Sequence, residues 1–235
     1  MKKLIIAMAA CMMIVGCKKE NKIELQVVSK TLAVKENWQI PASCKDAITY
    51  SSTNEYCVLV SQAGIVTARH YKGIGTEIKL LSKDDSKSFV VHVSPRNTLY
   101  TEPNIIFGQP KNLLGTPDAT TDNAYFYMNY GANAPFLLVM FDNSDHVDSY
   151  AILVNYDKKR DLDIFLEDRY ELIGTQDGTT FYRNALTAEE ATKAIGVELF
   201  SYSGMNYWMV VYMRYPHNKG NLELYEEAIK GFLKE

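Results

Sequence analysis

Apolar and polar residues alternate along the first hundred positions of the chain, and this alternation predicts strands. Successive side chains of a strand point to opposite faces, so a period of two marks a strand with one buried face. The alternation covers residues 23–28, 31–34, 38–42, 57–60, 65–66 and 88–93, with polar turn sequences at 51–54, 62–64 and 83–86. Many short strands separated by turns are typical of a β-sandwich. We expect the first two strands to pair with each other and the last segment to close the sandwich.

The second part of the chain mixes strand and helix signals. Strands are predicted at residues 125–130, 136–141, 149–156, 179–183, 197–202 and 207–214. Helices are predicted at 109–114, at 162–172 after a capping Asp161, at 187–196 after a capping box, and from Asn221 onward. The helix at 162–172 carries one apolar stripe, formed by Leu162, Phe165, Leu166 and Tyr170. The order of these elements predicts an α+β domain with an antiparallel sheet packed by helices.

A repeated order of elements suggests a duplicated unit in this second part. Helix, glycine, strand, loop, strand and helix follow one another around Gly115 and again around Gly196. The repeat aligns residues 125–130 with 197–202, and residues 136–141 with 207–212. The layout resembles that of envelope lipoproteins and inhibitor-like domains built from tandem helix-plus-sheet units.

Four short motifs follow one another in residues 48–78. They are Tyr50-Ser51-Ser52-Thr53-Asn54, Val58-Leu59-Val60, Gly64-Ile65-Val66-Thr67-Ala68 and Gly75-Thr76-Glu77-Ile78. In this order they resemble the bacterial immunoglobulin-like group 2 (BIG2) domain. The resemblance implies an immunoglobulin-like sandwich that serves as a stalk or adhesive spacer on the bacterial surface.

The N-terminus has the layout of a secretion signal. Two lysines precede an apolar run from Leu4 to Val15, which is shorter than the about 20 apolar residues of a transmembrane helix. Ile14-Val15-Gly16-Cys17 resembles the lipobox of bacterial lipoproteins, which implies cleavage before Cys17 and lipidation of its thiol. We therefore expect a lipid-anchored protein of the cell envelope, in the outer membrane, facing the surface or the periplasm. An ordinary secretion signal that ends in cysteine is the alternative.

Charge divides the chain into two parts of opposite sign. Residues 18–97 contain 12 basic and 8 acidic residues, whereas residues 98–235 contain 11 basic and 20 acidic residues. The acidic part would repel phosphates, so nucleic acid is not expected as a partner. The length of 235 residues suits two domains. We expect a signal peptide at 1–16, a tether at 17–22, the sandwich at 23–95 and the α+β domain at 96–235.

Two cysteines remain after Cys11 leaves with the signal and Cys17 carries the lipid. Cys44 and Cys57 could form a disulfide in an oxidising envelope, or both could be small buried hydrophobic residues. The second interpretation is favoured, because the resemblance to the BIG2 domain implies that Cys57 takes a strand position which that family fills with an apolar residue. The sequence has no Cys-x-x-Cys or His-Glu-x-x-His motif and its four histidines are scattered, so we expect no metal and no other cofactor.

The densest polar cluster is residues 142–148, Asp-Asn-Ser-Asp-His-Val-Asp. It begins like a calcium-binding loop but lacks the glycine at the sixth position and the distal glutamate, so we expect an acidic hairpin turn. The adjacent Ser144, Asp145 and His146 cannot converge as a catalytic triad. With no activated nucleophile or metal motif, the chain is not expected to be an enzyme. A carboxylate pair for glycan hydrolysis stays an alternative.

Aromatic residues on the strands are the candidate binding groups. The chain has 16 tyrosines. Tyr125 and Tyr127 share one face of their strand, and the last hairpin carries Tyr202, Trp208 and Tyr212. If helices cover one face of the sheet, the other face could expose these rings to a sugar or a protein partner. The alternative, that the same rings pack in the core or in cross-strand pairs, is the favoured interpretation.

These observations predict a non-catalytic, adhesion-type binding protein of the cell envelope. The sandwich would be a stalk, and the α+β domain would bind a glycan or a protein. The alternatives are a periplasmic inhibitor or assembly partner of another envelope protein, and a glycan-active hydrolase. The sequence leaves the ligand and the oligomeric state open.

Overall fold

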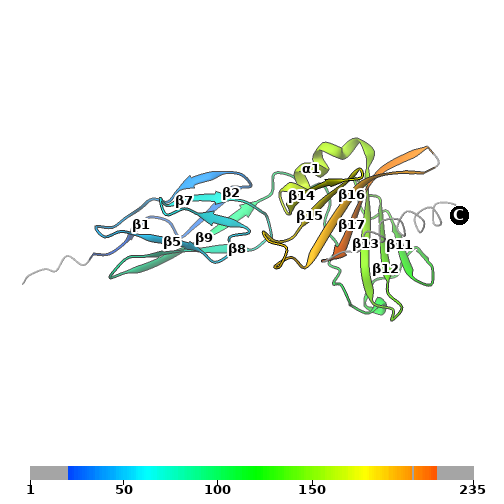
Figure 1. Cartoon of the computed structure of the whole chain (residues 1–235), viewed down its shortest axis with the longest axis horizontal. Helices are drawn as coiled ribbons and strands as arrows, with labels where there is room; N and C mark the ends of the chain where they lie inside the picture. Colours follow the sequence, from blue (N-terminus) through cyan, green and yellow to red (C-terminus); the bar gives the residue numbers. More distant parts are fainter. Residues whose placement is uncertain (1–20, 203, 216–235) are drawn as a thin grey trace, which may run out of the picture.

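The secondary structure is mostly β-strand, arranged in two units along the long axis of the molecule (Figure 1). This computed structural model describes residues 21–202 and 204–215. The N-terminal unit, blue to cyan in Figure 1, is a sandwich of small sheets, and the C-terminal unit, green to orange, is one large sheet. Separate apolar cores lie within the two units.

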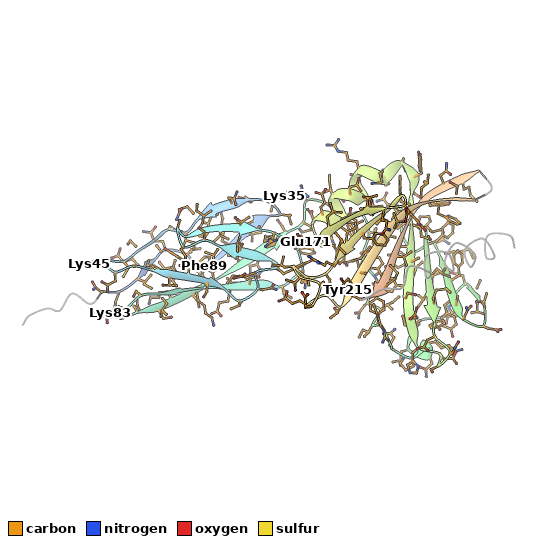
Figure 2. All side chains as sticks on the ribbon, viewed as in Figure 1. Lys35, Lys45, Lys83, Phe89, Glu171 and Tyr215 are labelled. Atoms are coloured by element: carbon orange, nitrogen blue, oxygen red, sulfur yellow. The ribbon has the colours of Figure 1, made fainter. Side chains whose placement is uncertain are left out.

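The N-terminal unit packs a four-stranded sheet against a three-stranded sheet. Their strand orders are β2-β9-β8-β5 and β3-β7-β6, and β1 and β4 form a separate pair. Leu32 and Ile78 of the first sheet and Val66 of the second are fully buried in the shared core. Trp38 packs edge-on against Phe89, which Figure 2 shows in the middle of the unit. The strands are β1 Glu24–Leu25, β2 Ser29–Ala33, β3 Asn37–Gln39, β4 Ala42–Ser43, β5 Thr49–Ser52, β6 Val58–Val60, β7 Ile65–Ala68, β8 Gly75–Leu81 and β9 Ser86–Ser94.

The expected pairing of the first two strands is wrong, although the all-β character of this unit is as expected. β1 pairs with β4, and β2 runs parallel to β9 with Leu32 opposite Val93. A parallel partner cannot be joined by a tight hairpin and lies far along the chain, so alternation alone does not identify it.

The C-terminal unit is an eight-stranded antiparallel sheet with the order β10-β11-β12-β13-β17-β16-β15-β14. The central strands carry apolar side chains on both faces. In β17, Met209 belongs to one buried cluster and Val210 to the other. The elements are η1 Lys111–Leu113, β10 Ala119–Thr120, β11 Ala124–Met128, β12 Phe136–Phe141, β13 Val147–Asn155, η2 Tyr156–Lys158, α1 Lys159–Glu167, β14 Glu171–Gln176, β15 Thr179–Arg183, β16 Lys193–Tyr202 and β17 Met205–Arg214.

The helix α1 packs on the face of this sheet that carries Tyr150, Tyr182 and Tyr212, which we call the tyrosine-rich face. The helix buries Leu162, Phe165 and Leu166, three of the four residues of the predicted apolar stripe, whereas the fourth, Tyr170, lies beyond the end of the helix. Asp161 lies in the first turn, where a carboxylate interacts favourably with the helix dipole, whereas Lys158 is the N-cap residue. The helix ends earlier than expected because the chain enters β14 at Glu171.

The expected set of helices packed on the sheet is not found in residues 21–202 and 204–215, where α1 is the only α-helix. Thr187 accepts a hydrogen bond from the Glu190 amide, as in a capping box, but the chain then enters β16. β16 pairs with a strand on each side. These two ladders outweigh the local helical preference of residues 187–196.

Three further expectations concern other segments. Residues 109–114 contain a short 3₁₀ turn, Lys111–Leu113, where a helix was expected. The helix expected from Asn221 and the lipidation site Cys17 lie outside the described residues. Within the described ranges, no helix has the length and apolarity needed to cross a membrane.

The strand order divides the large sheet into two similar halves. β10 to β13 form one antiparallel meander and β14 to β17 form another, and the last strands of the two halves, β13 and β17, pair with each other. This arrangement aligns β11 with β15 and β12 with β16. The repeat predicted around Gly115 and Gly196 instead aligned β11 with β16 and β12 with β17. The duplication of the sequence itself stays a prediction.

Candidate functional site

A four-residue segment of the sheet unit, Asp168 to Glu171, follows α1 and forms hydrogen bonds with the sandwich. The Tyr56 hydroxyl of the sandwich donates to the carbonyl oxygen of Arg169 at 2.7 Å. The Tyr71 amide donates to the carbonyl oxygen of Asp168 at 2.6 Å. Figure 2 shows Glu171 at the boundary between the units. We call residues 168–171 the junction segment.

The carboxylate of Asp168 is fully buried and fixes the linker between the units. It accepts a hydrogen bond from Nε of Arg96 at 2.7 Å and further bonds from the backbone amides of Arg96 and Asn97. A buried carboxylate is costly unless it is both paired and hydrogen-bonded. These contacts meet that condition, and they hold residues 96–97 against the end of α1.

A histidine of the sandwich contacts the last residue of the junction segment. Nε2 of His70 lies 2.9 Å from Oε2 of Glu171, and Nη2 of Arg69 lies 3.7 Å from the same oxygen. The imidazole stacks on the Tyr56 ring with centroids 4.4 Å apart. Burial lowers the pKa of His70, and the nearby Glu171 only partly opposes this. Burial therefore disfavours the charged form of this imidazole in the folded chain.

A cavity of about 230 Å³ opens between the two units beside the junction segment. The sandwich and the sheet unit both contribute to its lining, which consists of Tyr71, Lys72, Glu102, Arg169, Tyr170, Asn184 and Lys193. We call it the junction cavity. The sequence analysis missed this site, because its residues come from five separate stretches and no motif connects them.

Buried tyrosines contact the charged residues of the junction cavity. Nζ of Lys193 donates to the Tyr150 hydroxyl at 3.3 Å, and the Tyr170 hydroxyl donates to the Glu102 carboxylate. The hydroxyls of two more tyrosines in this core lie 2.7 Å apart. Burial raises the pKa of all four phenols, Tyr100, Tyr150, Tyr170 and Tyr212. They therefore stay protonated at neutral pH and act as hydrogen-bonding groups.

The predicted binding residues Tyr125 and Tyr127 lie on one face of β11, as expected, and both are half-buried. Tyr125 packs edge-on against Phe141 with ring centroids 4.8 Å apart. The Tyr127 hydroxyl donates to the carbonyl oxygen of Gly115 at 3.0 Å. Part of the chain before β10, including Leu114, packs on this face, so it is partly covered rather than open.

The predicted residues of the last hairpin differ in exposure. Tyr212 is fully buried and stacks on Tyr150, so it is a core residue, as the favoured of the two interpretations has it, and it is not available as a binding group. Trp208 is half-buried, lies parallel to the exposed Tyr156 ring at 6.0 Å, and donates its indole N–H to the Tyr156 carbonyl oxygen. Tyr202 ends β16, where it pairs with Met205 of β17.

A cleft of about 340 Å³ lies between β11 and the chain segment that precedes β10. We call it the β11 cleft. It is lined by Pro103, Ile105, Leu114, Gly115, Asp118, Tyr127, Met128, Tyr130 and Leu137. The Asp118 carboxylate accepts a hydrogen bond from the Met128 amide at 2.7 Å. Of the predicted binding residues, Tyr127 lines this cleft, and Tyr130, at the end of the same expected strand, was not singled out.

Cys44 and Cys57 are free thiols, so the disulfide that was one of the two alternatives is not formed. Cys57 is buried, and Nδ2 of Asn54 donates to its sulfur at 3.3 Å. The favoured alternative, a small buried hydrophobic residue, therefore fits Cys57. Cys44 is only partly buried.

The polar cluster at residues 142–148 is a hairpin turn between β12 and β13, as expected. Oδ1 of Asp142 accepts hydrogen bonds from the amides of Ser144 and His146, and Asp145 adopts a positive φ of 60°. In the part of the chain that the structure describes, no group of three or more His, Cys, Asp or Glu residues could hold a metal ion.

Comparisons with known proteins leave the family open. No family model matches the chain, and no curated protein is significantly similar to it. The resemblance of residues 48–78 to the bacterial immunoglobulin-like group 2 domain therefore stays a prediction from its motifs.

Proposed function

We propose that the chain is a lipid-anchored, non-catalytic binding protein of the cell envelope. The sandwich acts as a spacer, and the C-terminal sheet unit binds a glycan or a protein. The observation that carries this proposal is the β11 cleft, which places one of the predicted binding residues, Tyr127, at a concave surface.

The lining of the β11 cleft supports a binding role. Ligand sites combine an apolar lining with a few polar groups and have volumes of roughly 300–1,000 Å³. The cleft, at about 340 Å³, combines the side chains of Ile105, Leu114 and Leu137 with two tyrosine rings and the Asp118 carboxylate. Tyrosine rings beside hydrogen-bonding groups suit the faces of sugars as well as protein side chains.

A second candidate, an inhibitor or assembly partner of another envelope protein, rests on the surroundings of this cleft. Met128 lines it and is 47% exposed, and two large apolar residues next to lining residues, Ile106 and Leu113, are 65% and 71% exposed. Grouped exposed apolar side chains are typical of protein contact surfaces. They favour a protein partner over a glycan.

The arrangement of the two units supports the spacer role. Lys45 and Lys83 lie at the end of the sandwich farthest from the sheet unit (Figure 2). At the other end, the junction segment and Arg96 tie the units together through hydrogen bonds and ion pairs. An anchor at Cys17, before the first strand of the sandwich, would hold the sheet unit away from the membrane.

The test compares two lysine substitutions on exposed apolar residues of the same sheet. Met128→Lys places a charge in the β11 cleft, and Leu172→Lys places one on β14, at the opposite edge of the sheet, where Leu172 is 57% exposed. We expect Met128→Lys to weaken binding at least tenfold, which corresponds to about 1.4 kcal/mol, and Leu172→Lys to leave it unchanged.

Binding is measured with the full chain in detergent, first on a glycan array and then with purified proteins identified by cross-linking in intact cells. Glycan binding lost in Met128→Lys supports the main proposal. Binding to a purified protein of the same cell's envelope, lost in the same variant, supports the second candidate. Equal binding by the two variants would show that the cleft is not the contact site.

A further inference from the structure

The junction cavity contains more positive than negative side chains. Lys72, Arg169 and Lys193 line it, whereas Glu102 is the only carboxylate among its lining residues. The Glu102 carboxylate accepts the hydroxyl of Tyr170. None of the three cations forms an ion pair within the described residues, in contrast to Arg96 and Lys35 at the same junction.

Arg169 is the most buried of the three cations, with 8% of its surface exposed. Its Nη1 donates to the carbonyl oxygens of Asn97 and Phe165, and its guanidinium lies 3.7 Å from the centre of the Phe165 ring. The neighbouring Asp168 carboxylate is bonded to Arg96 instead. Backbone carbonyls and rings position this guanidinium without neutralising it.

Lys193 is half-buried and forms no ion pair within the described residues. Its Nζ contacts the Tyr150 hydroxyl and lies 5.4 to 5.9 Å from the centres of three rings, those of Phe107, Tyr150 and Tyr212. Burial lowers the pKa of this ammonium group, and the nearby Glu102 carboxylate only partly opposes the shift. Burying an unpaired charge reduces the stability of a protein, so the position favours an incoming anion that supplies the missing charge.

We propose that the junction cavity binds the oxyanion group of a small ligand, a carboxylate, phosphate or sulfate held by Lys72, Arg169 and Lys193. Guanidinium and ammonium groups form their strongest hydrogen bonds with such groups. The volume of about 230 Å³ lies below the usual range for drug-sized ligands, so it suits a small molecule or one terminal group of a larger one. The Glu102 carboxylate can accept hydrogen bonds from hydroxyl groups beside the anion, as in an acidic sugar. The Asn184 side chain is already bonded to Thr192 and to the Lys193 amide, and it holds this wall of the cavity in place.

This site is separate from the β11 cleft and does not depend on the function proposed for it. It uses residues of both units, since Lys72 belongs to the sandwich and Arg169 and Lys193 to the sheet unit. A ligand bound there therefore contacts both sides of the junction and stabilises their association.

The experiment follows binding of glucuronate, inorganic phosphate and sulfate to the full chain by calorimetry and by the thermal unfolding temperature, with chloride at equal ionic strength as reference. Lys193→Met removes the ammonium charge and keeps an unbranched apolar side chain. Lys111→Met is the matched control, because Lys111 pairs with Asp145 outside the cavity. Lys72→Ala, on an exposed residue, tests the same site if Lys193→Met does not fold.

We expect at least one of the three anions to bind saturably and to raise the unfolding temperature of the wild-type chain. Lys193→Met and Lys72→Ala should each weaken that binding at least tenfold, and Lys111→Met should not change it. A preference for glucuronate identifies a carboxylate ligand, and a preference for phosphate or sulfate identifies one of those groups. Equal stabilisation of wild type and both cavity variants would reflect the general effect of these salts on stability and would overturn the proposal, as would no binding of any of the three.

Discussion

At the scale of single residues, the junction shows two ways of holding a charge away from water. Asp168 has an ion pair and two backbone amides, which satisfy its carboxylate. Arg169, the next residue, has carbonyl oxygens and ring faces but no carboxylate. The first arrangement fixes the chain. The second leaves positive charge for a ligand, because carbonyl oxygens orient a guanidinium without cancelling its charge.

Asp168→Asn tests the structural half of this contrast. The substitution keeps the shape but removes the charge that Arg96 faces, and it brings an amide N–H₂ to a site built from donors. We expect the sheet unit to lose about 2–3 kcal/mol of unfolding free energy, since breaking a buried pair leaves its partner uncompensated. In a Trp38→Phe background, Trp208 of β17 is the single tryptophan of the chain. Urea denaturation monitored by its fluorescence therefore measures the stability of the sheet unit alone.

The control is Asp163→Asn, which breaks an exposed pair with Lys159 on α1. Its expected cost is below about 0.5 kcal/mol, because exposed pairs are screened by solvent. Similar losses in both variants would mean that Asp168 is no more than a surface ion pair.

At the scale of elements, tertiary partners decide between helix and strand. The apolar stripe of α1 and a capping box at residues 187–190 are both helix signals in the sequence. The stripe becomes a helix because Leu162, Phe165 and Leu166 are buried against the sheet. Residues 193–202 become a strand because β15 and β17 offer hydrogen-bond ladders on both sides. A local helix signal in the sequence therefore produces a helix only where tertiary packing stabilises that helix.

Phe165→Ala tests how far α1 depends on its packing. The ring is fully buried and lies 4.3 Å from the Tyr100 ring, centre to centre. Its removal should cost about 3–5 kcal/mol, the usual range for a large buried ring. The measurement is again urea denaturation followed by Trp208.

Arg160→Ala on the exposed side of the same helix is the matched control, with an expected change within about 0.5 kcal/mol. A small change in Phe165→Ala would show that the helix is not needed to cover the tyrosine-rich face.

At the scale of the whole molecule, the opposite charges of the two parts meet at the junction. Lys35 pairs with Glu167 at 2.8 Å, and Arg69 and His70 contact Glu171, so basic groups of the sandwich face acidic groups of the sheet unit. The Lys35 pair is largely exposed and contributes little. The buried contacts around the junction segment therefore dominate the association of the units.

His70 makes this junction sensitive to pH. Burial lowers the pKa of folded His70 below the ordinary value of 6.5, while Glu171 partly opposes and Arg69 adds to this effect. Above pH 6.5 the neutral form is present in folded and unfolded chains alike. As the pH falls from 6.5 through the lower folded pKa, the unfolded chain binds the proton first, and stability is lost.

We therefore expect the wild-type chain to lose more thermal stability between pH 7 and pH 5 than His70→Gln, in scans at a series of pH values. His92→Gln, on an exposed residue of β9, is the control and should follow the wild type. If His70→Gln and wild type lost stability in parallel, the imidazole would not be the responsive group.

The sequence by itself determined most strands, because alternation is a local pattern that each strand carries in its own residues. The bounds of β12 and β15 were predicted to the residue, and three of the four residues of the predicted apolar stripe lie on α1. Only the tertiary structure decided that β2 lies parallel to β9, that Tyr212 is buried, and that Lys72, Arg169 and Lys193 share one cavity. These features depend on contacts between segments distant in the chain. Ladder hydrogen bonds and burial stabilise these features only when both segments are in contact. The sequence of either segment alone therefore does not predict them.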